Sequence, residues 1–176
     1  MVAAMKLTNL IFALVTVLPC AALADSGKVV VKLADAKGAD VGTATLSSAG
    51  KGVSIALDVH GLTPGQHAIH IHETAKCDAP DFKSAGGHFN PDKKQHGAMN
   101  PNGPHAGDMP NFTVDAKGNA KTTVTDASVN LAAASDAHSV FAGGGTALVI
   151  HAKADDMKTD PAGNAGDRIA CGTITK

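Results

Sequence analysis

Short runs of β-branched and apolar residues, separated by turn signals, are the feature that most limits how this chain of 176 residues can fold. Between the runs stand segments such as Asp35-Ala36-Lys37-Gly38, and Gly and Asp are residues that tight turns favour. Many short strands joined by such turns predict an all-β sandwich or barrel, and no long amphipathic helix is expected. The expected strands span residues 28–33, 41–46, 53–59, 67–72, 112–114, 121–124, 147–151 and 169–174.

Two long stretches lack this alternation of strand-like runs and turns. Residues 73–110 are rich in Gly, Pro, Asn, His and Asp, and residues 152–168 form a second, shorter stretch without a strand pattern. Unstructured loops of such length are uncommon in a compact domain, and they are usually functional or disordered. The donor side chains in the first stretch favour the functional alternative.

Two histidines one residue apart, His70 and His72, lie in the apolar run at 67–72. Because side chains alternate between the two faces of a strand, both imidazoles would share one face. Two neighbouring rings are a costly filling for a core but a natural half of a metal site. A pair of ordinary surface or hydrogen-bonded histidines is the alternative that this spacing alone leaves open.

The first long stretch adds three more nitrogen donors, His88, His96 and His105, and a carboxylate at Asp108. Three imidazoles and one carboxylate make the four-coordinate set that zinc accepts, with no position left for water. The sequence therefore predicts a closed zinc site on this stretch.

A further histidine, His151, ends the strand-like run at 147–151. It forms a second nitrogen set with His70 and His72. Imidazole suits copper, and Cu(II) prefers nitrogen-rich planar sets, so this second set indicates a copper site.

This constellation resembles the copper/zinc superoxide dismutase family, in its exported bacterial type, over essentially all of the chain after residue 25. The resemblance implies an eight-stranded Greek-key barrel, in which residues 73–110 are the metal-binding loop and residues 152–168 the electrostatic loop. The motifs that carry it are His-Ile-His-Glu at 70–73, Gly-Gly-His-Phe-Asn-Pro at 86–91, His-Ala-Gly-Asp at 105–108, Val-Ile-His-Ala-Lys-Ala-Asp-Asp at 149–156 and Gly-Asn-Ala-Gly-Asp-Arg-Ile-Ala-Cys-Gly at 163–172.

The resemblance also implies a role for each ligand and a reaction. Superoxide would be converted to dioxygen and hydrogen peroxide by alternate reduction and reoxidation of copper, while zinc is structural and tunes the ring of His88, which both metals share. A ring without both protons carries negative charge, which two flanking cations stabilise. The copper ligands would be His70, His72, His88 and His151, and the zinc ligands His88, His96, His105 and Asp108.

Two further side chains acquire roles from the resemblance. Arg168 matches an arginine near copper, whose guanidinium offers two donors to a small anion. Asp155 matches a carboxylate that links ligands of the two metals, here His70 and His96, and so fixes their rings. Asp167 departs from the family pattern, and a negative charge beside Arg168 is expected to weaken the attraction of superoxide.

Residues 1–24 read as a secretory signal peptide rather than as part of the fold. Lys6 precedes the apolar stretch at 10–18, and Ala22-Leu23-Ala24 is a small-residue cleavage site. The domain is then expected at 25–176, in the periplasm or secreted. A lipid anchor on Cys20 is disfavoured because Pro19, and not a small residue, precedes it.

Removal of the signal leaves two cysteines, Cys77 and Cys171. An even count in an exported protein predicts a disulfide, and two buried free thiols are the alternative. Such a bond would tie the histidine-rich loop to the last strand.

The charge is balanced, with 15 basic and 16 acidic residues, so nucleic acid and stable membrane association are not expected. The resemblance allows a homodimer as well as a monomer. Two rival functions remain: a non-enzymatic metal-binding protein on the same barrel, and a zinc hydrolase. The complete ligand set and Arg168 disfavour the first, and Asp108 as a fourth zinc ligand disfavours the second.

Overall fold

A computed structural model describes residues 27–176, and the predicted signal peptide and Cys20 lie outside the described residues. The prediction of an all-β fold is confirmed, since the only helices in residues 27–176 are two short 3-10 turns, η1 (Lys83–Ala85) and η2 (Ala142–Gly144). The strands are β1 (Val29–Asp35), β2 (Asp40–Ala49), β3 (Gly52–Val59), β4 (Gly65–His67), β5 (Ile69–His72), β6 (Phe112–Val114), β7 (Ala120–Asp126), β8 (Thr146–His151) and β9 (Arg168–Ile174).

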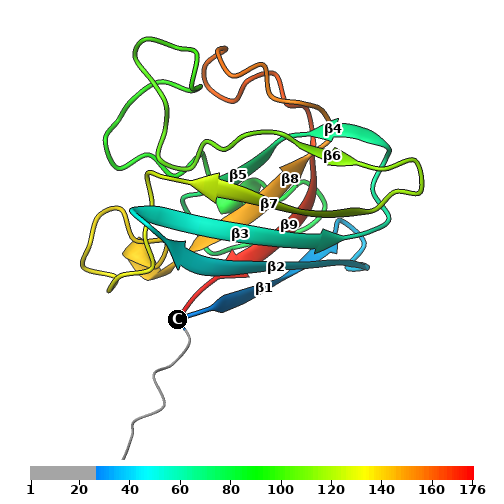
Figure 1. Ribbon diagram of the computed structural model, residues 1–176, viewed down its shortest axis with the longest axis horizontal. Coiled ribbons are helices and arrows are strands. Elements are labelled where there is room, and N and C mark those ends of the chain that lie inside the picture. Colours follow the sequence, from blue (N-terminus) through cyan, green and yellow to red (C-terminus); the bar gives the residue numbers. More distant parts are fainter. Residues whose placement is uncertain (1–26) are drawn as a thin grey trace, which may run out of the picture.

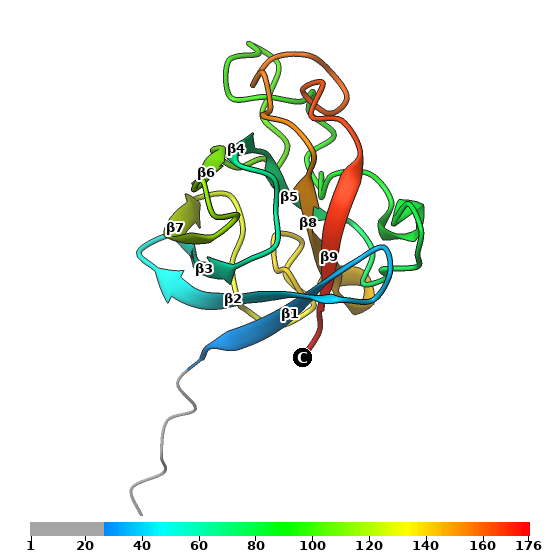
Figure 2. The same cartoon turned by 90° about the vertical axis from the view of Figure 1, so that its right-hand side faces the viewer.

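The strands curl into a barrel (Figure 1). Seven of them form one antiparallel sheet in the order β5-β8-β9-β1-β2-β3-β7, and β4 pairs with β6. Because β4 leads into β5 and β6 leads into β7, this pair spans the gap between the two ends of the large sheet (Figure 2). The neighbours β5–β8, β9–β1 and β3–β7 are not consecutive, which gives the crossing connections of a Greek key.

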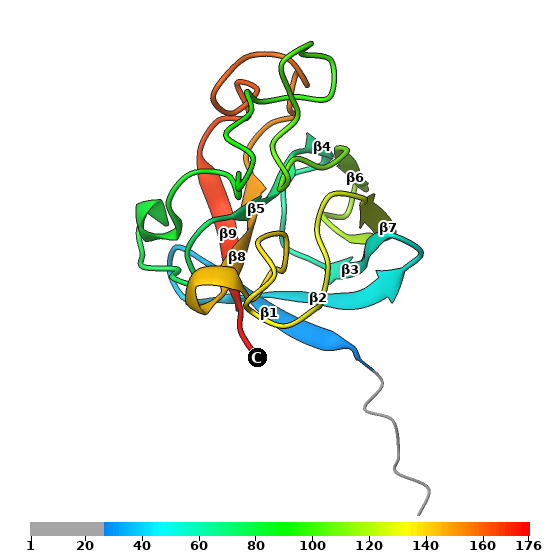
Figure 3. The ribbon, with the colours of Figure 1, turned by 90° about the vertical axis from the view of Figure 1, so that its left-hand side faces the viewer.

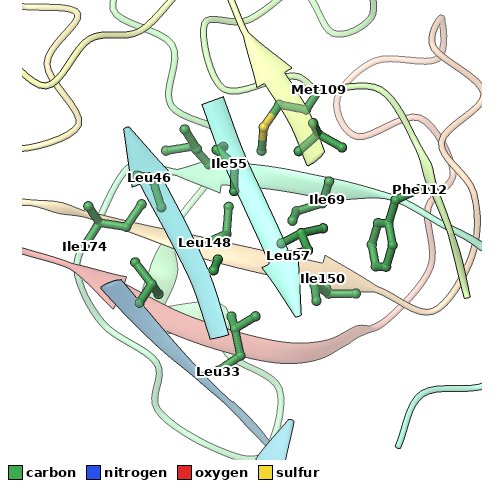
Figure 4. Packing of buried hydrophobic residues seen from close by; sticks show 14 of the residues in the cluster. Leu33, Leu46, Ile55, Leu57, Ile69, Met109, Phe112, Leu148, Ile150 and Ile174 are labelled. Atoms are coloured by element: carbon green, nitrogen blue, oxygen red, sulfur yellow. The ribbon is translucent and has the colours of Figure 1, made fainter. Parts of the chain in front are cut away.

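Alternation along the strands builds the core. In β3, Ile55 and Leu57 are buried while the intervening Ala56 and the following Asp58 are exposed, as expected for a strand with one face toward water. Figure 4 shows side chains from most strands packed in the barrel interior. The residues that it labels are Leu33, Leu46, Ile55, Leu57, Ile69, Met109, Phe112, Leu148, Ile150 and Ile174.

The expected strand at 67–72 is in fact two strands, which explains why nine strands are found where eight were predicted. His67 pairs with Phe112 of β6, whereas Ile69 pairs with Ile150 of β8. Between them, the backbone N–H of Ala68 donates to the carbonyl of Lys153 at 2.8 Å, so the chain changes partner at this residue.

The two predicted loops are confirmed as long segments without strands, at residues 73–111 and 152–167. The second is one residue shorter than expected, because Arg168 pairs with His151 and begins β9. Parts of both loops rise together at one end of the barrel, and the C-terminus lies at the opposite end (Figures 2 and 3). No helix within residues 27–176 has the length and apolar character needed to cross a membrane.

Candidate metal centre

Strand β5 presents its histidines on the outer side of the barrel. Ile69 and Ile71 belong to the core, so the alternation of the strand turns His70 and His72 the other way. Loop residues cover this outer face, and both histidines are completely buried. His151, the last residue of β8, lies beside them. The expectation that the two histidines share a face is therefore met by the structure.

Four imidazoles converge at this face and are here called the inner group: His70, His72, His88 and His151. One ring nitrogen of each lies within 4.8 Å of a nitrogen of every other member. Nε2 of His72 and Nε2 of His151 lie 3.4 Å apart. The arrangement provides an all-nitrogen donor set in a buried position.

A second group, here called the loop group, consists of His88, His96, His105 and Asp108. Its donors point at one position, because Oδ1 of Asp108 lies 2.8, 3.0 and 3.3 Å from the Nδ1 atoms of His88, His96 and His105. Tetrahedral ligands with bonds of about 2.0–2.1 Å lie about 3.3 Å from each other. The loop group therefore has the spacing that a tetrahedral metal ion needs.

The buried ring nitrogens without a hydrogen-bond partner test this fit. Within residues 27–176 they are Nδ1 of His70, Nε2 of His88 and Nδ1 of His96. A buried polar atom without a partner is costly, so these atoms require an acceptor of their lone pairs. A metal ion in each group satisfies that requirement.

In His72 and His151, Nδ1 forms a hydrogen bond with the backbone, while Nε2 belongs to the pair described above. Nδ1 of His72 donates to the carbonyl of Gly86 at 3.0 Å, and Nδ1 of His151 donates to the carbonyl of Gly166 at 3.3 Å. Such contacts fix which nitrogen keeps its proton and which faces the metal. His88 differs, because its Nε2 faces the inner group and its Nδ1 faces the loop group. The geometry makes His88 the one ring common to both groups.

Two carboxylates organise the remaining ligands. Oδ2 of Asp108 accepts the backbone N–H groups of Gly97 at 2.8 Å and His105 at 2.9 Å, which leaves Oδ1 for the loop group. Asp155 accepts Nε2–H of His70 at 2.8 Å and Nε2–H of His96 at 3.0 Å. It thus joins one ring of each group, at the position that the sequence indicated.

Burial sets the charge state of the inner group. It lowers the pKa of His72 to about 2 and the pKa values of His88 and His151 to about 4. It also lowers the pKa of His70. Neutral rings keep their lone pairs, so the inner group is ready to bind a metal at neutral pH.

The loop group holds a proton instead. Burial lowers the pKa of His96, but the nearby carboxylates of Asp108 and Asp155 outweigh it and raise that pKa to about 9. Contacts with His88 and His96 outweigh the burial of Asp108, and hydrogen bonds from His70 and His96 outweigh the burial of Asp155, so the pKa of each carboxyl lies well below its usual value. The loop group without metal therefore contains an imidazolium between two carboxylates.

Arg168 stands at the entrance to the inner group. Its guanidinium donates to the carbonyls of Phe82 and Gly86, each at 2.7 Å. Burial lowers the pKa of Arg168, and an arginine still remains charged at neutral pH. A cavity of about 510 Å³ leads from solvent to the histidines, and its lining includes His72, His88, His105, His151, Arg168, Pro161 and Ala162.

The predicted disulfide between Cys77 and Cys171 is confirmed, and it links positions 94 residues apart. The bond joins the beginning of the first loop to β9. Together with the hydrogen bonds of Arg168, it holds residues 77–86 against the outer face of the barrel.

Two supporting residues were not identified from the sequence. Asn111 fixes the backbone of Asp155, since its side chain donates to the carbonyl at 2.9 Å and accepts the N–H at 2.8 Å. Gly163 lies against the same carboxylate, where a Cβ would overlap Oδ1 of Asp155. No pattern in the sequence signals either contact, because the Asn111 contact depends on how the two loops pack together and the Gly163 contact on how the second loop folds back on itself.

Comparison with known proteins places this centre in context. A family model described as copper/zinc superoxide dismutase matches residues 41–174. Cu-Zn superoxide dismutase 1 of Aquifex aeolicus is 51% identical over 163 residues, which are 92% of this chain and 96% of that protein. An extracellular Cu-Zn superoxide dismutase of Caenorhabditis elegans is 37% identical over 157 residues, covering 86% of this chain and 65% of that protein.

A solved structure shares the fold. The crystal structure of a SOD-like protein from Bacillus subtilis superposes with a TM-score of 0.79 and 39% identity. The match covers 82% of this chain and 97% of that one.

Proposed function

The chain belongs to the copper/zinc superoxide dismutase family, and we propose that it disproportionates superoxide with copper in the inner group and zinc in the loop group. The observation that carries this proposal is the convergence of seven donor side chains on two positions that share His88. Copper in the inner group would supply one-electron redox chemistry: one superoxide gives up an electron and leaves as dioxygen, and a second takes up an electron and two protons and leaves as hydrogen peroxide.

His88 is the residue that handles a proton in this scheme. Its Nδ1 lies among the loop-group donors, while its Nε2 faces the inner group and has no protein partner within residues 27–176. Nε2 is therefore the atom of this ring that would be able to hold a proton on the side of the inner group. It can then deliver that proton to the peroxide product in the adjoining cavity.

Arg168 attracts and orients the anion. Its charge lies on the wall of a cavity that His72 and His151 also line, so an anion entering the cavity approaches both the guanidinium and the inner group. The carbonyls of Phe82 and Gly86 hold the side chain in place, which limits the loss of side-chain freedom on binding.

The loop group has the character of a structural site. Asp108 fills a fourth ligand position and is fixed through its other oxygen, so no position is left for a reactive water. A hydrolase would need such an open position. The loop group therefore supports the dismutase and not a zinc hydrolase.

A non-enzymatic metal-binding role is the alternative on this fold, since one protein with a similar structure is described only as SOD-like. The fold alone does not decide between them. The complete donor set and Arg168 favour the enzyme.

Measurement of copper and zinc per chain together with superoxide turnover tests the proposal. We expect one copper, one zinc and rapid turnover. In His88→Ala we expect the copper and zinc content per chain to change and superoxide turnover to be lost. Full metal content without turnover in the native chain would favour the alternative.

The proposal places the protein outside the cytoplasm. The signal-like pattern at 1–24 supports this, as does the Cys77–Cys171 disulfide, because disulfides persist in oxidising compartments. Mass spectrometry of the exported protein tests it: we expect cleavage after Ala24, which removes Cys20, and not a chain that begins at a lipid-bearing Cys20. The family resemblance also allows a homodimer, which stays a prediction that sedimentation velocity can test.

A further inference from the structure

The two loops are joined next to His96. The backbone N–H of Met99 donates to the carbonyl of Met157 at 2.8 Å, and the side chain of Asn100 donates to the carbonyl of Lys158 at 3.4 Å. The contact is close, because a Cβ added to Gly97 would overlap the carbonyl of Met157. The segment that follows Met157 is therefore held directly against the loop group.

Asp160 extends this contact to two ligands of the loop group at once. Its Oδ1 accepts the backbone N–H of His96 at 2.6 Å, and the same oxygen lies 3.9 Å from Nε2 of His105. The ring of His105 turns its Nδ1 toward Asp108, so Asp160 stands at the opposite side of that ring. A metal on Nδ1 makes Nε2–H more positive, which a nearby carboxylate stabilises.

The chain that follows Asp160 forms part of the cavity wall. Pro161 and Ala162 line the cavity together with His105, His88 and Arg168. Asp160 therefore connects the backbone of a loop-group ligand to the segment that lines the cavity.

We propose that Asp160 is a positioning residue, whose carboxylate fixes the backbone of His96 and the ring of His105 and thereby ties the wall of the cavity to the zinc ligands. This inference rests on the zinc assignment of the proposed function. It differs from the role of Asp155, which joins the side chains of His70 and His96 and makes no contact with His105.

The structure separates two parts of this role. The hydrogen bond from His96 needs only an acceptor oxygen, which an asparagine amide also supplies. The interaction with Nε2–H of His105 depends on negative charge, because the distance of 3.9 Å exceeds that of a direct hydrogen bond. Asp160→Asn thus removes the charge and keeps the acceptor, whereas Asp160→Ala removes both.

Zinc release from the fully metallated protein into an excess of chelator tests the inference. Substitution of residues that orient metal ligands typically costs 10–100-fold in affinity. Because Asp160 is half-exposed, we expect the lower end: release about tenfold faster in Asp160→Ala and an intermediate rate in Asp160→Asn. The visible spectrum of cobalt in the zinc position should shift in Asp160→Ala and be largely restored in Asp160→Asn.

Asp167→Asn is the matched control. Asp167 belongs to the same loop and is exposed, and its carboxylate makes no hydrogen bond or ion pair with residues 27–176. We expect its zinc release and cobalt spectrum to equal those of the native chain. A general effect of removing acidic charge from this loop would instead appear in all the variants.

Wild-type release rates and an unchanged cobalt spectrum in both Asp160 variants would overturn the inference and leave the proposed function intact. A native chain that holds no zinc would overturn both. If Asp160→Ala does not fold, the isosteric Asp160→Asn decides alone, through faster release with the copper content unchanged.

Discussion

The backbone carbonyl oxygen of Gly86 accepts hydrogen bonds from two functional side chains. It accepts a hydrogen bond from Nδ1 of His72 at 3.0 Å and another from Arg168 at 2.7 Å. The residue proposed to attract the substrate and a residue proposed to hold copper are thus positioned by one atom. Gly86 also has a positive φ of 79°, and a Cβ there would overlap the carboxylate of Glu73. Glycine is therefore required at this position.

Arg168→Ala should lower kcat/KM for superoxide by about tenfold, because charge near an active site raises association rates by about 10–1,000-fold. Its remaining dependence on ionic strength should also be weaker. Arg168→Lys keeps a charge but not the two anchored donors, so its rate should lie between the two. Unchanged kcat/KM in Arg168→Ala at normal copper content would show that the guanidinium does not guide the anion.

Gly163→Ala should loosen the Asp155 bridge, whereas Gly143→Ala should not. Both glycines have a φ of 62°, so an alanine meets the same backbone strain of about 1–2 kcal/mol at either position. Only at Gly163 would the new methyl group also collide with Asp155, since nothing lies within 4 Å of a Cβ at Gly143. Zinc content and melting temperature of the two variants check this, and equal values in both would contradict the packing argument.

Zinc and copper binding should depend differently on pH. The pKa of His96 is raised to about 9, so this ring carries a proton at neutral pH that zinc must displace. Apparent zinc affinity of the metal-free protein should then rise about tenfold per pH unit up to about pH 9, with about one proton released per zinc at pH 7.

Copper binding to the zinc-free protein should show little proton competition above about pH 5, because the pKa values of His72, His88 and His151 are lowered to about 4 or below. The number of protons released when each metal is titrated into a weakly buffered solution measures the proton competition of zinc and of copper. Release by copper but not by zinc would reverse the expected order and contradict these charge states.

At the scale of elements, the centre joins a rigid barrel to two long loops. The inner group takes His70, His72 and His151 from β5 and β8, whereas all of the loop group comes from residues 73–111. Sites on strands are placed more precisely than sites on loops. The Cys77–Cys171 bond compensates for this difference by fixing the start of the first loop to β9.

Reduction of this disulfide should lower the melting temperature by about 10 °C. The closed loop of 94 residues corresponds to about 4–5 kcal/mol in the chain-entropy model, and about 2–4 °C accompany each kcal/mol in a protein of this size. Calorimetry with and without reductant measures the change. The double variant Cys77→Ser and Cys171→Ser, which reductant should not affect, is the control. No shift in the native chain would mean that the bond does not support the fold.

The elements also show why the sequence predicted some features and missed others. Alternation in a strand is local, so the common face of His70 and His72 could be read from spacing alone. The break at Ala68 could not, because it depends on a hydrogen bond to Lys153, far away in the chain. Asn111 and Asp160 were missed for the same reason: each acts through backbone groups of the opposite loop.

Across the whole molecule, the centre lies at the outer surface of the barrel while the core fills its interior. The apolar cluster of the interior, which includes Leu46, Ile55 and Leu148, holds β5 and β8 in place without taking part in metal binding. Both faces of these two strands are nevertheless buried, because the loops cover the outer one. The architecture thus keeps the histidines of the inner group buried and neutral, while a cavity leads to them from solvent.

The central claim is that two metal ions share the ring of His88. Anomalous diffraction at the copper and zinc absorption edges of crystals of the metallated protein tests it directly. With bonds of about 2.0–2.1 Å to each nitrogen of one imidazole, the ions should lie about 6 Å apart, copper beside Nε2 and zinc beside Nδ1. A single ion, or two ions of which one does not contact His88, would contradict the account.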